Sequence, residues 1–170
     1  MRIAVLSDTH DNIQNITKAV SIINKRNIDA LIHCGDYVAP FVIKPFDKLN
    51  DSIKKNFYGV FGNNDGDKIF LTQNLGQICE FPQNGHELIL ELGGKRIFVS
   101  HMPREQTIKA LANSGNFDII LSGHTHSLSN KKFDNGSLVI NPGELCGYLT
   151  GRATFAIVDT EKMESEIIDL

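Results

Sequence analysis

Short apolar runs and one amphipathic stretch alternate over residues 1–34. The apolar run at residues 2–7 is too short for a helix and predicts a buried strand. A helix is predicted to follow, because apolar residues recur at spacings of three and four, at Ile13, Ile16, Val20 and Ile23. Asp11 or Asn12 is placed to cap it. A second apolar run at 30–34 predicts another strand, and this order implies a right-handed crossover and a parallel pair.

The middle of the chain changes from strand–helix alternation to hairpins. Residues 41–49 predict a second helix and residues 56–61 a third strand. Three further strands are predicted at 77–81, 87–92 and 95–99. The last two are joined by a hairpin turn that contains Gly93 and Gly94.

The last part of the chain is predicted to be one helix and four strands. Pro103 opens the helix, which runs to Asn113 and is ended by Gly115. The strands are predicted at 118–121, 137–140, 153–158 and 165–168.

This order of elements favours a single α/β domain over residues 1–170. The sequence has no internal repeat, no low-complexity run and no linker that would divide it. A chain of this length buries roughly 70% of its unfolded surface, which is ample for one core. Strand–helix alternation followed by hairpins predicts two packed sheets with helices on their outer faces.

Composition narrows the classes of partner. Hydrophobic residues make up 41% and charged residues 22%, as in ordinary globular proteins, and the formal net charge is −3. The basic stretches are no longer than pairs such as Lys54-Lys55, which argues against binding long nucleic acid. A nucleotide-sized substrate stays compatible with this charge if metal ions supply the positive charge.

The cysteines and the chain start suggest a reducing compartment. Cys34, Cys79 and Cys146 are odd in number and widely spaced, unlike a disulfide framework or a zinc knuckle. Cys34 closes an apolar strand and is interpreted as a small buried residue rather than a nucleophile. The chain starts directly with a strand and contains no apolar stretch of membrane-spanning length. We therefore expect a cytoplasmic protein with no membrane partner.

Histidines and carboxylates gather directly after the apolar runs. Four of the six histidines belong to this set. The segments are Asp8-Thr9-His10, Gly35-Asp36, Gly62-Asn63-Asn64-Asp65, His101 and Gly123-His124-Thr125-His126. The carboxyl ends of parallel strands meet at one sheet edge, so these side chains are expected to lie together. Oxygen and nitrogen ligands without thiolate suit manganese, iron, zinc or magnesium. Each motif alone is weak, since Gly-Asp is often only a turn.

The five segments, in this order, resemble the calcineurin-like metallophosphoesterase superfamily. The chain length and the ending Asn141-Pro142-Gly143 are similar to its small branch, the YfcE-type phosphodiesterases. The resemblance covers the chain from Met1 to its C-terminus. It implies a four-layer α/β/β/α sandwich of two mixed β-sheets with flanking helices.

The resemblance also implies two divalent metal ions that share Asp36 as a bridging carboxylate. Asp8, His10 and His126 would complete one site, and Asn63, His101 and His124 the other. The expected ion is Mn²⁺, with Ni²⁺, Fe²⁺, Zn²⁺ or Mg²⁺ also compatible. A hydroxide held between the ions would hydrolyse small phosphodiesters. Catalysis is assigned to Asp36, Asn64 and Asp65.

The chain departs from the family pattern at three places. Many relatives carry a histidine where this chain has Asn64, which cannot act as a general acid at neutral pH. Many small relatives have His-Gly-His where this chain has His101-Met102-Pro103. In the segment 144–152, Glu144 replaces a common serine.

Several alternatives stay open. Arg104 or Arg152 contacts a substrate phosphate, or is a surface arginine paired with an acid. His33 supports a metal ligand or is a core residue, and His86 lies in a solvent-facing turn. The protein as a whole is a phosphodiesterase, a fold that keeps metal for stability, or a protein-interaction scaffold like the retromer subunit of this fold. Homo-oligomerisation is possible in each case.

Overall fold

The computed structural model describes residues 1–170 and contains two five-stranded sheets. The first sheet has the order β10-β9-β1-β2-β3. Its strands are β1 (Arg2–Leu6), β2 (Ala30–His33), β3 (Phe57–Gly59), β9 (Thr154–Asp159) and β10 (Glu164–Asp169). β1, β2 and β3 are parallel neighbours, and β9 and β10 continue the sheet antiparallel. The parallel pair expected at the start of the chain is confirmed.

The second sheet has the order β4-β5-β6-β8-β7. Its strands are β4 (Glu87–Leu92), β5 (Lys95–Ser100), β6 (Ile119–Leu121), β7 (Ser129–Lys132) and β8 (Leu138–Asn141). β5, β6 and β8 are parallel, while β4 and β7 run antiparallel at the two edges. Both sheets are therefore mixed.

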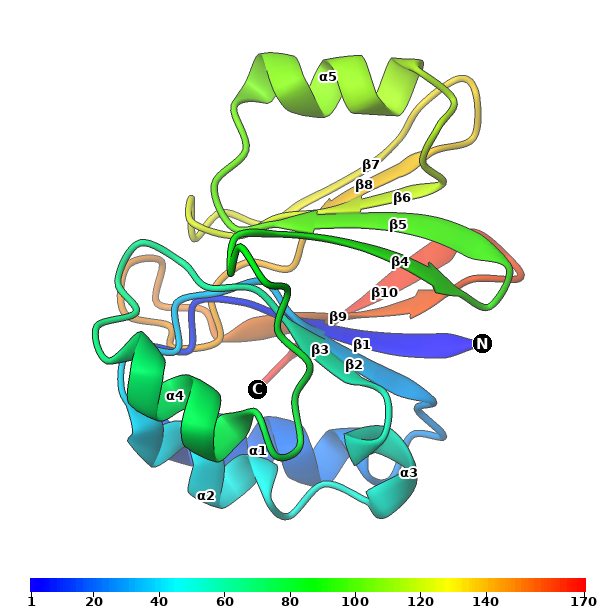
Figure 1. The fold of residues 1–170 in the computed structure, drawn as a ribbon. Helices are drawn as coiled ribbons and strands as arrows, with labels where there is room; N and C mark the ends of the chain where they lie inside the picture. The colour runs from blue at the N-terminus through cyan, green and yellow to red at the C-terminus, as the bar shows by residue number, and fades with distance from the viewer.

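Helices cover the outer face of each sheet, which gives four layers (Figure 1). One helix, α5 (Glu105–Asn113), lies over the second sheet. The first sheet is covered by α1 (Ile13–Ile23), the 3₁₀ turn η1 (Pro40–Val42), α2 (Ile43–Phe46), α3 (Asp51–Lys54) and α4 (Lys68–Leu75). The predicted α/β/β/α sandwich of two mixed sheets is confirmed.

The core is divided among the three interfaces between these layers. A cluster of 22 buried apolar residues lies between the first sheet and its helices, and one of 16 lies between the two sheets. A smaller cluster of 5 residues, which includes Phe98 and Phe117, lies under α5. None of the helices combines the length and the apolar character that a membrane crossing needs.

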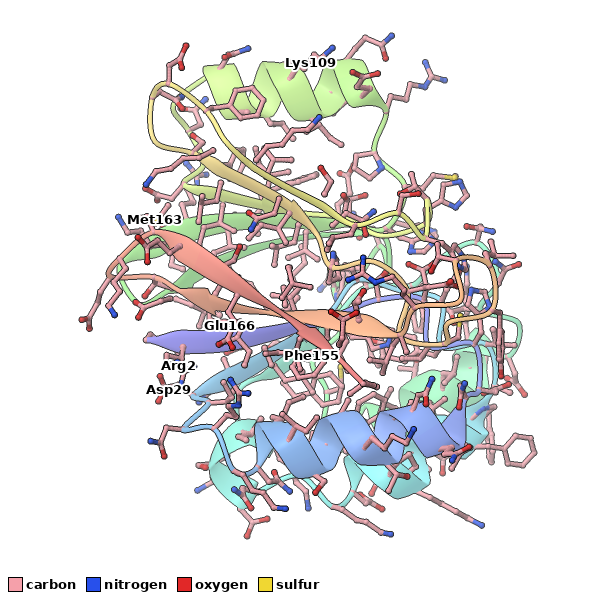
Figure 2. The ribbon with its side chains drawn as sticks, turned by 180° about the vertical axis from the view of Figure 1, so that it is seen from behind. Arg2, Asp29, Lys109, Phe155, Met163 and Glu166 are labelled. Atoms are coloured by element: carbon pink, nitrogen blue, oxygen red, sulfur yellow. The ribbon has the colours of Figure 1, made fainter.

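The beginning of β1 lies at the end of the first sheet away from the histidine-rich loops. Figure 2 shows Arg2 and Asp29 side by side there, with Glu166 on β10 close by. The Arg2 amide donates to Asp29 Oδ2 at 2.7 Å, and Arg26 pairs with Glu166 at 3.0 Å. Charged residues on β10 protect an edge strand from pairing with another chain.

Two predicted elements differ from the structure in extent. The helix expected at 41–49 is the shorter pair η1 and α2, which ends at Phe46. Pro45 lacks the amide hydrogen that a continuous helix needs at this point. The helix expected from Pro103 begins at Glu105 instead.

One prediction of secondary structure is wrong, and two elements of the structure were not predicted. The strand expected at 77–81 is absent, and only Glu80 forms an isolated bridge with Tyr58. The preceding helix α4 was not predicted, although Asp67 caps it by accepting from the Phe70 amide at 2.9 Å. Strand β7 was not predicted either, because its sequence Ser-Asn-Lys-Lys is an exposed edge without apolar alternation.

Candidate metal centre

The seven predicted ligands lie on loops that leave the carboxyl ends of five strands. Asp8 and His10 follow β1, Asp36 follows β2, and Asn63 follows β3. These strands belong to the first sheet. His101 follows β5, and His124 and His126 follow β6, in the second sheet. In Figure 1 these loops meet at the left-hand end of the molecule.

The first group of ligands is compact and mostly buried. Ligand atoms of Asp8, His10, Asp36 and His126 all lie within 4.8 Å of one another. Asp8 Oδ1 lies 3.8 Å from His10 Nε2 and 3.4 Å from His126 Nε2. The rings of His10 and His126 stack at 5.1 Å.

The second group is joined to the first through Asp36. Asn63 Oδ1 lies 3.0 Å from His101 Nε2 and 2.8 Å from His124 Nδ1. Asp36 Oδ2 lies 3.4 Å from His101 Nε2 and 3.5 Å from His10 Nε2. One carboxylate oxygen therefore lies between the two groups of predicted ligands.

Unpartnered polar atoms show that these residues fit a cation. Asp8 Oδ1 and His10 Nε2 are buried and have no hydrogen-bond partner, which is uncommon for buried polar atoms. The other oxygen of Asp8 accepts from the His124 amide at 3.0 Å, so Oδ1 is the free one. A positive ion between these atoms would satisfy both.

Two of the histidines have a hydrogen-bond acceptor at the Nδ1 side of the ring. His101 Nδ1 lies 2.8 Å from the Cys34 carbonyl, which can only accept, so Nδ1 carries the proton and Nε2 faces Asn63. His126 Nδ1 lies 2.6 Å from Glu144 Oε2. Such acceptors fix the tautomer and the orientation of metal-binding histidines. Burial lowers the pKa of His101, but hydrogen bonding to Asp36 outweighs it and raises the pKa above its usual value.

Glu144 is a contact that the sequence did not reveal. It was noted only as a replacement for serine, yet it is fully buried. It accepts from the Leu149 amide at 3.0 Å, the Thr150 hydroxyl at 2.7 Å and the Cys146 thiol at 3.1 Å. Burial raises the pKa of Glu144, but the hydrogen bonds from His126 and Thr150 lower it to about 2. Glu144 is thus an anion that supports His126 and orders the segment 144–152.

Asn64 holds Asp36. Its amide N–H donates to Asp36 Oδ1 at 2.8 Å, and its side-chain Nδ2 donates to Oδ2 at 2.7 Å. Burial alone would raise the pKa of Asp36, yet hydrogen bonds from His101 and the Asn64 amide keep that pKa well below its usual range. Asp36 is therefore ionised at neutral pH.

Asp65 lies beside the ligands but faces the backbone. Its carboxylate accepts from the amides of Asp36 at 3.1 Å, Val38 at 2.8 Å and Gly62 at 2.6 Å. These bonds tie the loop after β2 to the loop after β3. In this geometry Asp65 positions the loops that carry Asp36 and Asn63.

His33 is a core residue that contacts the same loops. The Gly35 amide donates to Nδ1 at 3.1 Å, so the ring proton is on Nε2, which lies 3.2 Å from the Thr9 hydroxyl. The Thr9 hydroxyl lies 3.2 Å from the Asp36 carbonyl, to which it donates. Burial lowers the pKa of His33 to about 3. The hydrogen bonds of the His33 ring reach the ligand-bearing loops through Thr9 and Gly35.

The backbone at the ligands is strained. Five of the seven have positive φ, from 40° to 68°: Asp8, His10, Asp36, His124 and His126. Side chains other than glycine rarely adopt this region, at a cost of order 1–3 kcal/mol each. A Cβ on Gly62 would collide with the Asp36 carboxylate. Strain and close approach of this kind cluster at functional sites.

The two arginines considered as phosphate ligands are both exposed. Arg152 makes a bidentate ion pair with Asp169, with N–O distances of 2.9 and 3.0 Å, and both side chains are exposed. Arg104 precedes α5 and is exposed. His86 is exposed in the turn before β4, as predicted. It nevertheless lines a hollow together with Asn63 and His101.

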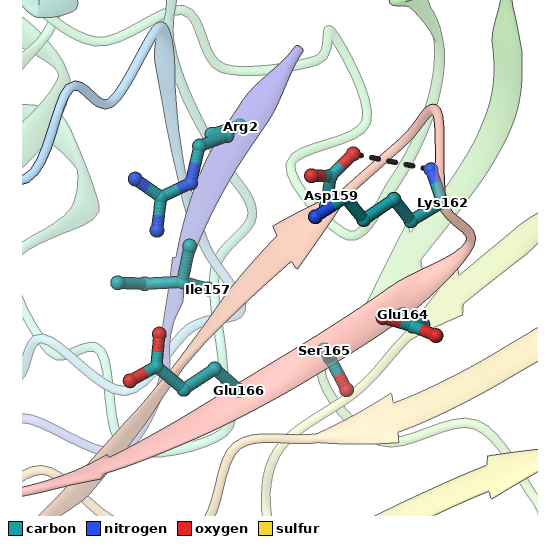
Figure 3. Close-up of a pocket in the computed structure, with 7 residues that line it drawn as sticks. All are labelled: Arg2, Ile157, Asp159, Lys162, Glu164, Ser165 and Glu166. Carbon is teal, nitrogen blue, oxygen red and sulfur yellow. Dashed lines mark hydrogen bonds between the residues drawn. The ribbon is translucent and has the colours of Figure 1, made fainter.

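A hollow of about 360 Å³ lies at the other end of the first sheet, around Arg2 (Figure 3). Its acids are Asp159, Glu164 and Glu166, and its second cation is Lys162. Asp159 accepts there from the Lys162 amide at 3.2 Å. Arg2 begins β1 whereas Asp8 follows its far end, so this hollow is separate from the histidine cluster.

Fold, ligand placement and sequence agree on the class: the chain belongs to the calcineurin-like phosphoesterase superfamily. The sequence model of that superfamily domain matches residues 1–163. The chain is 42% identical over 164 residues to Phosphodiesterase MJ0936 of Methanocaldococcus jannaschii, covering 96% of each protein.

Solved structures agree with this placement. The structure of an archaeal phosphodiesterase has a TM-score of 0.90 and 39% identity, covering 100% of both chains. The E. coli phosphoesterase Yfce has a TM-score of 0.66 at 17% identity, covering 99% of this chain and 98% of that one. Vps29 of Entamoeba histolytica in complex with zinc has a TM-score of 0.69 at 16% identity, covering 99% of each chain. The last two share the fold.

Proposed function

We propose that the protein is a metal-dependent phosphodiesterase that hydrolyses small phosphodiesters at a centre of two divalent ions. The observation that carries the proposal is the position of Asp36 Oδ2, 3.5 Å from His10 and 3.4 Å from His101. The similarity to two phosphodiesterases over nearly the whole chain supports the same activity. A fold that keeps metal only for stability has no need of a ligand set open to solvent at His124 and Asn63.

Each group of residues has the ligands for one ion. Asp8, His10 and His126 would hold the first, Asn63, His101 and His124 the second, and Asp36 both. Two divalent ions, when bound, supply Lewis acidity toward the phosphate and an activated water at neutral pH. Asp36 offsets the repulsion between the ions, because its carboxylate stays ionised. Asn63 contributes a neutral oxygen, so the centre keeps net positive charge for an anionic ester.

The mixed oxygen and nitrogen ligands support Mn²⁺ as the working ion, with Ni²⁺, Fe²⁺, Zn²⁺ and Mg²⁺ as alternatives. Elemental analysis after saturation should give close to two equivalents per chain. Asp36→Ala should lose most binding at both sites, because it removes the shared ligand. A protein that reproducibly binds no transition metal would overturn the proposal in favour of an interaction scaffold.

The three cysteines are free and buried, which supports a reducing, cytoplasmic setting. A homo-oligomer is also compatible with the proposal, and light scattering on the purified protein measures it.

The deciding experiment is hydrolysis of bis(p-nitrophenyl) phosphate by chelated protein to which each divalent ion is returned separately. We expect activity with at least one transition metal and a lower rate on p-nitrophenyl phosphate. A diester has one fewer ionisable oxygen than a monoester, so it binds the ions less tightly as an unreactive anion. Equal rates without metal and with metal would contradict the proposal.

A further inference from the structure

A hollow of about 300 Å³ opens directly beside the second group of ligands. Asn63 and His101 form one part of its wall, and Lys68, His86, Ser100 and Met102 form others. Its volume is at the small end of the range for ligand sites. A part of the substrate bound in this hollow would therefore lie close to the scissile phosphate at the predicted metal ligands.

The hollow differs in charge from the one around Arg2. No carboxylate lines it, whereas three acids line the other. Lys68 is its only lysine or arginine, and its ammonium takes part in none of the ion pairs of the chain. The hollow therefore offers an uncompensated positive charge next to the metal ligands.

Lys68 is placed by its surroundings. Its Nζ lies 5.8 Å from the centroid of the Phe61 ring, a cation–π distance. The Phe61 ring is buried and stacks on Phe81 at 4.5 Å with an angle of 9° between the planes. Lys68 is also the first residue of α4, and Asp67 caps that helix. These contacts place the Lys68 ammonium beside the Phe61 ring, where no carboxylate pairs with it.

His86 also lines this hollow, and its ring has no hydrogen-bond partner within the chain. Its backbone amide donates to Asn84 Oδ1 at 3.0 Å, which fixes the turn before β4. Its exposed imidazole forms no hydrogen bond within the chain. An ammonium and an imidazole N–H that converge on a space without acids can make charge-assisted hydrogen bonds to an anion.

We infer that this hollow is a subsite for a second phosphate of the substrate, carried a few bonds away from the scissile diester. The inference rests on the proposed phosphodiesterase function and names its substrate class: small diesters with an additional phosphate. Lys68 supplies the charge and His86 a directional donor. Both are specificity-determining residues, and neither takes part in bond cleavage.

The test compares two esters that differ only in that phosphate. They are thymidine 5′-(p-nitrophenyl phosphate) and the same ester with a 3′-phosphate. The wild-type protein should show kcat/KM at least about tenfold higher for the 3′-phosphorylated ester. Lys68→Met and His86→Leu, which remove the charge and the N–H donor respectively, should each reduce that ratio toward one. Lys18→Met removes an exposed lysine of α1 that lies outside the hollow and should keep the ratio.

Calorimetry gives a readout independent of turnover. Thymidine 3′,5′-bisphosphate should bind the metal-loaded protein at least about tenfold more tightly than thymidine 5′-monophosphate, and Lys68→Met should remove the difference. A different outcome is that inorganic phosphate binds only when Lys68 is present while kcat/KM is equal for the two esters. This result would indicate a site for free anions and would overturn the inference. Equal affinities of the two nucleotides would overturn it as well.

The two proposals fail separately. No hydrolysis of bis(p-nitrophenyl) phosphate with any metal would remove the phosphodiesterase function. Hydrolysis of that ester with no preference for the 3′-phosphate would leave the function and remove the subsite.

Discussion

At the scale of single residues, Asn64 determines which leaving groups we expect the protein to expel. Its backbone N–H and its side-chain Nδ2 donate hydrogen bonds to the two oxygens of Asp36. The side-chain amide cannot transfer a proton to a leaving group at neutral pH. A positioned acid is worth typically 10²–10⁴-fold when an alkoxide departs. We therefore expect aryl diesters to react much faster than alkyl diesters, with a steep dependence of rate on leaving-group pKa.

Asn64→His should flatten that dependence, with a gain of about tenfold or more on alkyl esters if the imidazole reaches the departing oxygen. Asn64→Ala is the control, because it also loses the side-chain bond to Asp36 but adds no acid. The measurement is log rate against leaving-group pKa for the three proteins. A flat dependence in the wild type would mean that another residue donates the proton.

Glu144 is expected to act on the proposed metal centre through its hydrogen bond with His126. Glu144→Gln keeps the size of the side chain but removes the anion that accepts from Nδ1 at 2.6 Å. Loss of such a partner typically costs 10–100-fold in metal affinity. Competition with a coloured chelator should show this loss, and the exposed Glu164→Gln should show none. If Glu144→Gln leaves the metal affinity unchanged, the carboxylate only orders the segment 144–152.

His33 should make stability depend on pH. Its folded pKa of about 3 lies below the ordinary value of 6.5, so the unfolded chain takes up a proton that the folded chain excludes. The free energy of unfolding therefore falls as the pH drops from 6.5 toward 3, by up to about 1.4 kcal/mol per pH unit from this group. Urea unfolding of chelated protein should show a shallower slope for His33→Gln than for wild type. The exposed His86→Gln should keep the wild-type slope.

At the scale of elements, the strands that end in ligands and the helices α1 and α5 were predictable, whereas α4 and β7 were not. An apolar run followed by a polar cluster marks β1, β2, β3, β5 and β6. Each of these buried strands ends at the edge of its sheet, where a polar loop begins. Helix α4 has no such signal, since Ile69 and Phe70 are exposed and its apolar residues do not gather on one face. The contact of Glu144 with His126 joins two loops through tertiary packing, which no local pattern encodes.

The loop after β3 gives a matched pair of glycines for testing how closely the backbone approaches Asp36. A Cβ at Gly62 would collide with the Asp36 carboxylate, whereas one at Gly66 meets nothing nearer than 3.9 Å. We expect Gly62→Ala to lower metal content and diesterase activity by about tenfold or more, because a shift of about 1 Å at a positioned group can cost 10²-fold. Gly66→Ala should behave as wild type. Equal activity of the two variants would show that the loop moves aside freely.

At the scale of the whole molecule, metal should stabilise the fold. Ligand binding at one hundred times its Kd adds about 2.7 kcal/mol, which for a chain of this size corresponds to roughly 5 °C or more in Tm. Calorimetric melting should therefore show a lower Tm after chelation and recovery when Mn²⁺ is returned. Asp36→Ala should melt at the same temperature with and without chelator. A wild-type Tm insensitive to chelation would show that metal contributes nothing to folding.

The lack of a basic surface argues against binding of long nucleic acids. With a net charge of −3 and no basic track, few phosphates beyond those near the site can be contacted. Activity on small diesters should therefore survive moderate salt. Tight binding to long DNA or RNA with a steep salt dependence would contradict this.

The ligands are divided between the two sheets, four residues on loops of the first and three on loops of the second. The distances within the ligand set therefore depend on how the two sheets are aligned. A small shift of one sheet across the other would separate the ligands of the first sheet from those of the second. The alignment is set by the packed side chains between the sheets, such as Val5, Ile32 and Val99. Enlarging or trimming one of these buried residues would thus be felt as poorer metal retention, although none of them touches an ion.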